Sequence, residues 1–186
     1  RHAPVKALFM GGVREPMMVY WPGVTRPGTE CAQRVIIEDF YPTILEMAGV
    51  KSYKTRQVID GVSFADALKE HRINPDRTLI WHFPNLWETQ NKEEGYGAYS
   101  AILKGNYHLI YTWETRQLRL YNVKEDIGEQ NDLAQSMPDK VKELAKELSD
   151  YLRARDAQRP TLIQDQQLIP YPDEKKDQSI GFKKNA

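Results

Sequence analysis

The first hydrophobic feature of the chain is a short, uninterrupted apolar run at residues 17–21. A run without polar alternation is typical of a strand that is covered on both faces. Gly11-Gly12 precedes the run and favours a tight turn because neither residue carries a Cβ, and Pro22-Gly23 ends the run. The pattern therefore predicts a tight turn that leads into one buried strand.

A helix is predicted over residues 39–48. Asp39 is a suitable N-cap residue, and Gly49 stands at the position just beyond the helix where glycine is favoured. Apolar residues recur at helical spacing at Phe40, Ile44, Leu45 and Ala48. One strand and one short helix cannot enclose a core, so we expect residues 1–60 to pack on structure that precedes residue 1.

The pattern then changes from one short helix to several strands. Residues 61–78 contain a short amphipathic helix with Phe64, Ala67 and Leu68 as its apolar positions. Lys104-Gly105-Asn106 is a hairpin signal between two apolar runs, which predicts an antiparallel meander of three or four strands. The predicted strands are residues 79–83, 99–103, 107–113 and 117–123.

The last predicted helix spans residues 139–155. Ser136 and Asp139 resemble a capping box, and Pro138 lies early in the helix, where proline is tolerated. Its apolar stripe should cover one face of the meander. The stripe consists of Val141, Leu144, Leu148, Tyr151 and Leu152.

After residue 159 the chain is polar and rich in proline. We expect it to run extended over the surface, with Leu168, Ile169 and Tyr171 held in grooves.

Composition narrows the function classes. The 186 residues include 40% hydrophobic residues, enough for a core, and 26 basic and 26 acidic side chains that sum to zero net charge. This balance gives no electrostatic case for nucleic acid or an anionic membrane, and no apolar run approaches the roughly 20 residues that span a bilayer. Cys31 is the only cysteine, so no internal disulfide can form.

A series of short motifs resembles the sulfatase family. Each motif alone is weak, but their shared order over about residues 3–155 is specific. The series comprises Gly11-Gly12-Val13-Arg14-Glu15-Pro16, Trp21-Pro22-Gly23, Asp39-Phe40-Tyr41-Pro42-Thr43, Asp60-Gly61-Val62-Ser63, Trp81-His82-Phe83-Pro84, Lys104-Gly105-Asn106-Tyr107-His108, Leu120-Tyr121-Asn122-Val123 and Asn131-Asp132-Leu133-Ala134.

The resemblance implies an α+β fold. It combines the terminal strand and helix of an alkaline-phosphatase-like α/β domain with a small antiparallel meander packed against a C-terminal helix. Residues 1–60 would be the end of the catalytic domain, residues 61–157 the small C-terminal domain and residues 158–186 a surface tail. The implied function is that of the C-terminal portion of a sulfuric ester hydrolase, and export or a lysosomal or periplasmic location fits the family.

The chemistry that the resemblance implies is incomplete in these residues. Family members make a formylglycine nucleophile from a Cys/Ser-x-Pro/Ala-x-Arg motif and bind calcium through acidic side chains and an Asn. Cys31 is followed by Ala32-Gln33-Arg34, which departs from that motif, so Cys31 is interpreted as a small hydrophobic residue. Residues 126–132 are rich in oxygen ligands but lack EF-hand spacing, which favours a hydrogen-bonded connection. We therefore expect no cofactor in this chain, calcium in a complete family member, and no activity of the chain alone.

Lys6 is the candidate catalytic residue. Sulfatases place a sulfate-binding lysine shortly before a Glu-Gly-Gly turn, and Lys6 lies one position out of that register, with Met10 in place of the Glu. The stretch at residues 3–6 equally resembles an Ala-Pro-Leu-Arg segment further upstream in the family. In that alignment Lys6 is a surface lysine and the catalytic lysine is absent.

His82 is the candidate substrate-binding residue. It ends a predicted strand beside Trp87 and an irregular loop, a region that approaches the active-site rim in the family. The alternative is a structural histidine bonded to backbone. His108 is expected on a polar or interface face of the meander.

Two other functions remain open. The chain could be a non-catalytic binding or interaction module, or part of a related phosphonate or phosphate ester hydrolase. The partners implied by the resemblance are a sulfated small molecule or glycan, bound through a complete enzyme, and either an N-terminal catalytic portion or a second copy of the chain.

Overall fold

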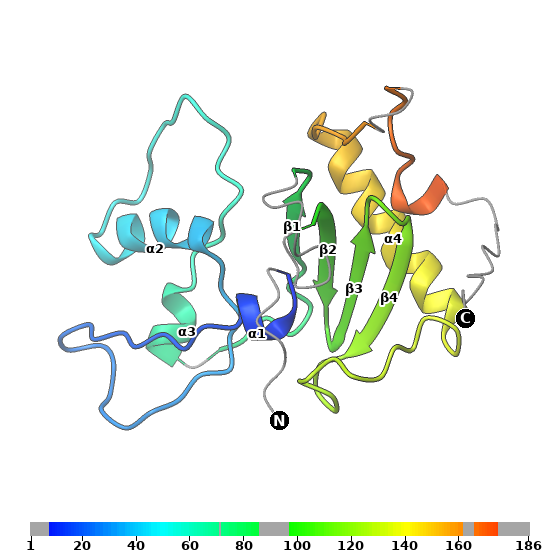
Figure 1. The fold of residues 1–186 in the computed structure, drawn as a ribbon. Helices are drawn as coiled ribbons and strands as arrows, with labels where there is room; N and C mark the ends of the chain where they lie inside the picture. The colour runs from blue at the N-terminus through cyan, green and yellow to red at the C-terminus, as the bar shows by residue number, and fades with distance from the viewer. Residues whose placement is uncertain (1–7, 71, 86–96, 162–165, 175–186) are drawn as a thin grey trace. The chain divides into compact units, whose positions relative to one another are not determined.

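The chain has an α+β fold, as predicted, and its contacts divide it into two compact units (Figure 1). The computed structural model describes residues 8–70, 72–85, 97–161 and 166–174. Unit 1 comprises residues 1–15 and 80–186, and unit 2 comprises residues 16–79. The domain boundary expected near residue 60 concerns the longer family fold and stays a prediction.

The predicted meander is confirmed as a four-stranded sheet in the order β1-β2-β3-β4. The β2–β3 and β3–β4 pairs are antiparallel, with Ala101 opposite Ile110 and Ile110 opposite Arg119. Gly105 has a φ of +55°, which a glycine adopts without strain in the β2–β3 hairpin. The strands are β1 (Leu79–Phe83), β2 (Tyr99–Lys104), β3 (Tyr107–Thr112) and β4 (Gln117–Asn122).

Helix α4 (Pro138–Ala154) lies against one face of this sheet, as predicted (Figure 1). Leu144, Leu148 and Leu152 are at most 1% exposed and pack on the inward side chains of β2, β3 and β4. Each such burial contributes about 1.5–3 kcal/mol before the loss of conformational entropy is subtracted. The predicted capping box is wrong, because the Ser136 hydroxyl donates to the Leu133 carbonyl and Met137 is the N-cap residue.

The opposite face of the sheet holds residues 8–13 of unit 1. Here the expected tight turn at Gly11-Gly12 is one turn of helix, α1 (Met10–Val13). Leu8 and Phe9 are buried against Ala101, Ile110 and Tyr121. The sheet of unit 1 is therefore covered on both faces.

Residues 166–174 of the C-terminal tail make specific contacts with the rest of unit 1. Ile169 is buried in the α4 core, and the Tyr111 hydroxyl donates to the Pro170 carbonyl at 3.0 Å. Burial raises the pKa of Tyr111 to about 12. Tyr171 is partly buried, whereas Leu168 is 53% exposed, so the expectation that it occupies a groove is wrong. A short 3₁₀ helix, Pro172–Glu174, follows.

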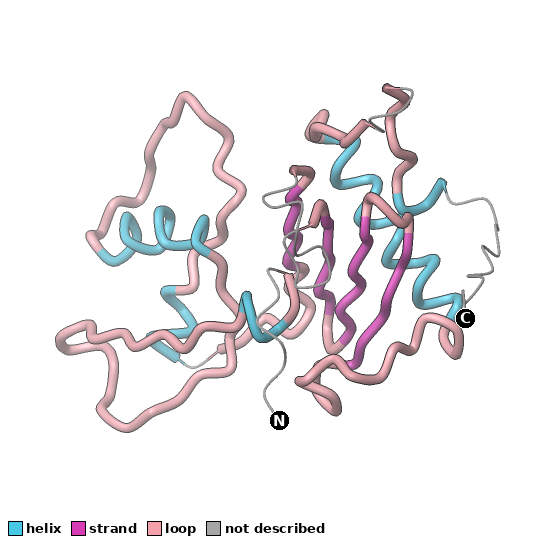
Figure 2. The backbone as a smooth tube through the Cα atoms, in the orientation of Figure 1, coloured by secondary structure: helices cyan, strands magenta, loops and turns pink. Residues whose placement is uncertain are grey.

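Unit 2 consists mostly of loops, as Figure 2 shows. Its regular elements are a 3₁₀ helix (Ile37–Asp39), α2 (Phe40–Met47) and α3 (Ala65–Glu70). The predicted helices are thus confirmed, and Gly49 has the left-handed φ of +77° expected just after α2. Asp39 does not cap α2, because its carboxylate instead accepts the Ile36 N–H at 3.0 Å.

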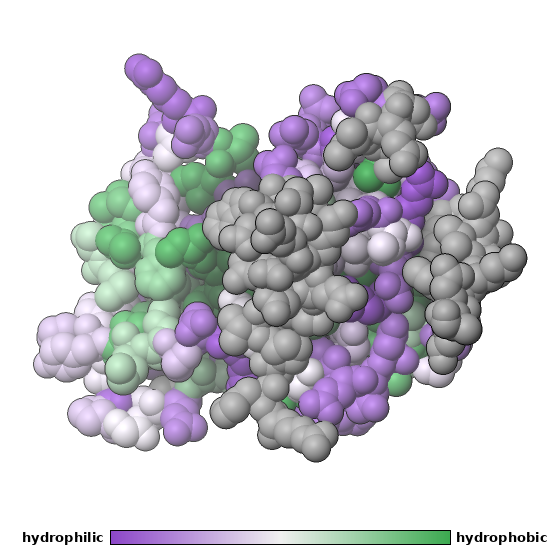
Figure 3. Space-filling view, in the orientation of Figure 1, coloured by the Kyte–Doolittle hydropathy of each residue, from purple (hydrophilic) through white to green (hydrophobic). Residues whose placement is uncertain are grey.

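The predicted strand at residues 17–21 is not formed, since no other strand in the described part of unit 2 could pair with it. Met18 is 99% exposed and Tyr20 80%. Ile44, on the apolar side of α2, is also exposed, and Figure 3 shows hydrophobic residues gathered over unit 2. Among the described residues no helix has the length and apolarity to cross a membrane.

Candidate functional site

Of the two candidate site residues, only His82 lies within the described residues. Lys6 falls outside them, so its role stays a prediction. His82 lies on β1, and both of its ring nitrogens are within hydrogen-bond distance of a partner in the chain. Nε2 is 2.8 Å from the Gln158 carbonyl oxygen, and Nδ1 is 2.7 Å from the Ser100 hydroxyl.

The partners of His82 determine its tautomer. A carbonyl oxygen can only accept, so Nε2 carries the hydrogen and Nδ1 accepts from Ser100. The Trp113 indole N–H donates to the same Ser100 oxygen at 2.8 Å. Burial lowers the pKa of His82, and the bond to Gln158 offsets this only in part. The arrangement suits a neutral imidazole.

This Ser–His pair is not a nucleophile and its base. Ser100 is fully buried, and its oxygen already accepts from Trp113 while its hydroxyl donates to His82. A nucleophile needs a free approach to its oxygen. The pair instead connects β1 to β2, to Trp113 just after β3, and to the segment after α4. A role of His82 at a substrate rim stays a prediction.

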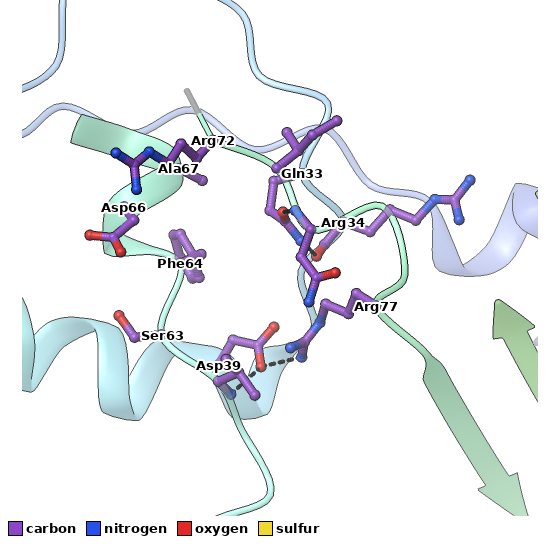
Figure 4. A pocket seen from close by; sticks show the side chains of 12 residues that line it. Gln33, Arg34, Asp39, Ser63, Phe64, Asp66, Ala67, Arg72 and Arg77 are labelled. Atoms are coloured by element: carbon purple, nitrogen blue, oxygen red, sulfur yellow. Dashed lines mark hydrogen bonds and ion pairs between the residues drawn. The ribbon is translucent and has the colours of Figure 1, made fainter. Parts of the chain in front are cut away.

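Unit 2 is organised around the carboxylate of Asp39, which is 1% exposed. Its Oδ1 accepts the Val62 N–H at 2.8 Å and the Arg77 guanidinium at 2.5 Å, the ion pair marked in Figure 4. Its Oδ2 accepts the Ile36 N–H. A buried carboxylate is tolerated when several donors satisfy it, and here the donors come from three separate segments.

Two motifs that are far apart in sequence meet at this carboxylate. Thr43, one turn beyond Asp39, donates to the Asp39 carbonyl at 2.6 Å and accepts the Phe64 N–H at 3.0 Å. Gly61 passes so close to Glu38 that a Cβ there would lie 1.9 Å from the Glu38 carbonyl oxygen. The Asp39–Thr43 motif and the Asp60–Ser63 motif therefore form one packing unit. Sequence reasoning had not linked Arg77 to either motif.

A cavity of about 200 Å³ lies beside the Asp39–Arg77 pair (Figure 4). Many of its polar groups already have partners within unit 2: the Gln33 side chain accepts the Asn74 N–H at 2.7 Å, and Ser63 donates to Glu46. The Arg77 Nε is buried without a hydrogen-bond partner. The lining residues include Gln33, Arg34, Asp39, Ser63, Arg72 and Arg77.

Unit 1 holds a second buried carboxylate that sequence reasoning missed. Glu129 accepts from His108 Nδ1 and from the Met10 N–H, both at 2.6 Å. His108 is fully buried, so a polar face, one of the two positions expected for it, is wrong, and an interface face stays a prediction. The only sequence signal was the alternation of β3, which places His108 on the same face as Ile110.

The oxygen-rich connection at residues 126–132 is hydrogen-bonded, as predicted. The Asp126 carboxylate accepts the N–H groups of Gln130 and Asn131, both at 2.8 Å. Asp132 accepts the N–H groups of Leu120 and Ala134. Among the described residues no group of three or more acidic, His or Cys side chains could hold a metal ion. Cys31 is exposed with a free thiol.

Comparison with known protein families shows which family the chain belongs to. The model of the family described as "N-sulphoglucosamine sulphohydrolase, C-terminal" matches residues 6–158. The chain belongs to this family. The match to this sulphohydrolase family spans the Gly11-Gly12 turn, the Asp39 packing unit, the meander and α4.

Individual sulfatases resemble the chain over most of its length. A sulfatase from Formosa agariphila is 34% identical over 178 residues, which cover 91% of this chain and 32% of that protein. An uncharacterized sulfatase from Escherichia coli is 28% identical, over 73% of this chain and 28% of its own. The chain thus spans about a third of the length of these relatives.

Solved structures share the fold of this sulphohydrolase-family chain at lower identity. One, in complex with its substrate D-glucosamine-2-N,6-O-disulfate, has a TM-score of 0.57 and 22% identity, covering 84% of this chain and 29% of that chain. A sulfatase structure from Bacteroides fragilis has a TM-score of 0.58 and 15% identity, covering 74% and 29%. The α+β fold expected from the sulfatase resemblance is confirmed.

Proposed function

We propose that this chain is the C-terminal portion of a sulfuric ester hydrolase and is catalytically incomplete by itself. The observation that carries the proposal is the family match over residues 6–158, combined with the missing nucleophile motif. No Cys/Ser-x-Pro/Ala-x-Arg segment occurs in the 186 residues. The buried carboxylates of Asp39 and Glu129 are already bonded to backbone and side-chain donors.

A complete enzyme would need a metal ion, a nucleophile and cations that hold the transferring group. These parts act together, because no one of them alone stabilises the charge that develops on that group. Calcium is the metal that the family resemblance implies. The carboxylates of Asp39, Asp126 and Asp132 do not fit it, because each is occupied by internal donors. We assign the calcium ligands to another part of such an enzyme.

The substrate class proposed is a sulfated saccharide. Support comes from the structural relative bound to D-glucosamine-2-N,6-O-disulfate and from a second one, of TM-score 0.57, bound to k-i-k-neocarrahexaose. His82 is the residue proposed at the rim of the substrate site and Lys6 the residue proposed to hold the sulfate. For His82, a change in preference among sulfated saccharides without loss of the chemical step would support this role.

The partner proposed is an N-terminal catalytic portion, which would cover apolar residues that unit 2 leaves exposed. Met18, Ile37 and Val58 are between 74% and 99% exposed. Scattered exposed apolar residues are normal, but several on one small unit indicate an interaction surface. Self-association of two copies would cover the same residues. Dilution reverses self-association, whereas a catalytic portion joined to these residues in one longer chain stays in contact on dilution.

Turnover of an aryl sulfate by the purified chain, with and without added calcium, tests the proposal. We expect no turnover and no tight calcium binding by calorimetric titration. Metal-dependent turnover that survives Cys31→Ala would show a catalytic site elsewhere in the chain and overturn the proposal. Turnover that Cys31→Ala abolishes would make Cys31 a nucleophile outside the family motif, and would overturn it equally.

A further inference from the structure

Apolar contacts attach residues 8–13 of unit 1 to the sheet. Leu8, Phe9 and Met10 are each at most 7% exposed. The Phe9 and Tyr121 rings lie 6.1 Å apart, and the Arg119 guanidinium lies 5.0 Å from the Phe9 ring. Apolar contacts of this kind give affinity but do not define one position along the chain, because sliding by a residue can preserve much of the buried area.

A buried carboxylate fixes the position of this segment along the sheet. The first N–H of α1, at Met10, has no capping side chain from its own segment. It donates instead to Oε2 of Glu129 at 2.6 Å, a residue 119 positions later in the sequence. The other oxygen of the same carboxylate accepts from His108 Nδ1 at 2.6 Å. The side chains of His108 and Glu129 are both 0% exposed.

The surroundings of this carboxylate are built to orient it. His108 packs edge-on against Trp81, with ring centroids 5.9 Å apart, and its Nε2 is buried without a hydrogen-bond partner. The His108 ring therefore orients the Glu129 carboxylate through the single hydrogen bond from Nδ1. Glu129 itself has a φ of +51°, a left-handed conformation that residues with a side chain seldom adopt. Such a strained conformation at a non-glycine residue persists only when the surrounding contacts hold the residue in place.

We propose that Glu129 is a positioning residue, held by His108, that fixes the Gly11-Gly12 turn on the small domain through the Met10 N–H. The consequence for catalysis rests on the proposed function, because in a complete sulfatase this turn would follow the sulfate-binding lysine. The structural part of the proposal does not depend on activity. It requires only that the turn loses its fixed position when either end of this hydrogen bond is removed.

Met10 offers a matched pair of variants. Met10→Pro removes the N–H and suits the first position of a helix, and the extended φ and ψ of Phe9 (−82°, 159°) are those favoured before proline. Met10→Ala removes the same buried side chain beyond Cβ but keeps the N–H. Glu129→Ala removes the acceptor, Glu129→Gln keeps an acceptor oxygen, and Glu125→Ala is a control at an exposed position on the same connection.

The measurement is amide hydrogen exchange at Gly12, Val13 and Arg14, which donate to Phe9 and Met10 carbonyls within the turn. We expect exchange at least tenfold faster in Met10→Pro than in Met10→Ala, and a similar gain in Glu129→Ala. Glu129→Gln should restore most of the protection, and Glu125→Ala should change nothing. Amides of β3 report global opening and should stay protected.

A second readout follows the imidazole itself. The buried Nδ1–H of His108 should give a slowly exchanging, downfield proton resonance that persists in Glu125→Ala. The resonance should be lost in Glu129→Gln, because the amide oxygen takes the Met10 N–H and the amide NH2 then faces His108 Nδ1. Equal exchange in Met10→Pro and Met10→Ala would overturn the proposal. If Glu129→Ala does not fold, the two Met10 variants still decide it. None of these results bears on whether the chain belongs to an active sulfatase, which the turnover assay addresses separately.

Discussion

At Gly61 the backbone passes so close to Glu38 that there is no room for a side chain. The same contact places Val62 where its N–H reaches the Asp39 carboxylate at 2.8 Å. The two oxygens of Asp39 thus connect the segments around residues 36, 62 and 77. A residue without a Cβ and a buried carboxylate together hold a unit that has little regular structure.

Gly61→Ala should therefore destabilise unit 2. Inserting a methyl group at 1.9 Å from the Glu38 oxygen forces the backbone apart, and overpacking typically costs about 1–3 kcal/mol. Urea unfolding, monitored by hydrogen exchange of peptides from residues 36–64, measures the loss of unfolding free energy. Gly128→Ala is the matched control, since its nearest neighbour is the flexible Gln130 side chain at 3.3 Å. Parent-like unfolding of Gly61→Ala would show that the close approach does not exist in solution.

His82 should give the stability of unit 1 a dependence on pH. Burial lowers its pKa in the folded protein below the ordinary value of about 6.5, so the unfolded chain binds the proton more readily. The free energy of unfolding should then fall as the pH drops below about 6.5, until the folded-state pKa is passed. His82→Gln, whose amide can still donate to the Gln158 carbonyl, should remove this part of the slope. Identical slopes for parent and variant between pH 8 and pH 5 would contradict the assignment.

Hydrogen bonds between residues far apart in sequence explain why the burial of His108 was not predicted. His108 was expected on a polar or interface face because histidine is polar, but Glu129, 21 residues later, provides the acceptor that permits burial. Nothing in local patterning shows that pair, nor the link to Met10. The connection at residues 126–132 was predictable, since Asp and Asn side chains commonly bond nearby backbone N–H groups.

At the scale of elements, β1 to β4 and α4 match their predictions closely. Their signals are local: apolar runs bounded by turn residues, the Gly105 hairpin, and a stripe at helical spacing. The strand at residues 17–21 failed because a strand is stabilised by neighbours, and the described part of unit 2 contains none. Among the described elements, type followed the sequence where the signal was local, as in the hairpin and α4.

Leu148→Ala should test the packing of α4 on the sheet. Leu148 is 0% exposed within the core cluster, and large-to-small changes at such positions cost about 2–5 kcal/mol. Urea unfolding of the variant against the parent gives the difference. Lys142→Ala, at an exposed position of the same helix, should stay within about 0.5 kcal/mol. If the Leu148→Ala curve overlays the parent curve, the buried face of α4 is misassigned.

At the scale of the whole molecule, the two units differ in how they are stabilised. Unit 1 has a sheet covered on both faces, and its tail is fixed by Arg153, which pairs with Asp173 and Glu174 at 2.7–2.9 Å. Burial acts to raise the pKa of Asp173, but hydrogen bonds from Arg153 and Ser149 outweigh it, and the pKa is lowered. Unit 2 depends on the Asp39 network and leaves Met18, Tyr20 and Ile44 exposed. Most of residues 1–60, which the sequence predicted to need a partner, lie in unit 2, and unit 2 also has most of the exposed large apolar residues among those described.

Residues 17–20 should consequently exchange their amide hydrogens rapidly in a dilute monomer of this chain. None of their amides donates a hydrogen bond within the described structure, and exchange without protection is expected for such groups. Amides of Leu109 and Ile110 in β3 provide the protected reference within the same sample. Replacing Met18 and Tyr20 by Ser should leave the unfolding transition of unit 1 unchanged, because neither residue belongs to its core, and should reduce concentration-dependent association if the exposed face drives it. Slow exchange at residues 17–20 in a proven monomer would mean that this segment finds its partners within the chain, and the need for an outside catalytic portion would then lose its structural support.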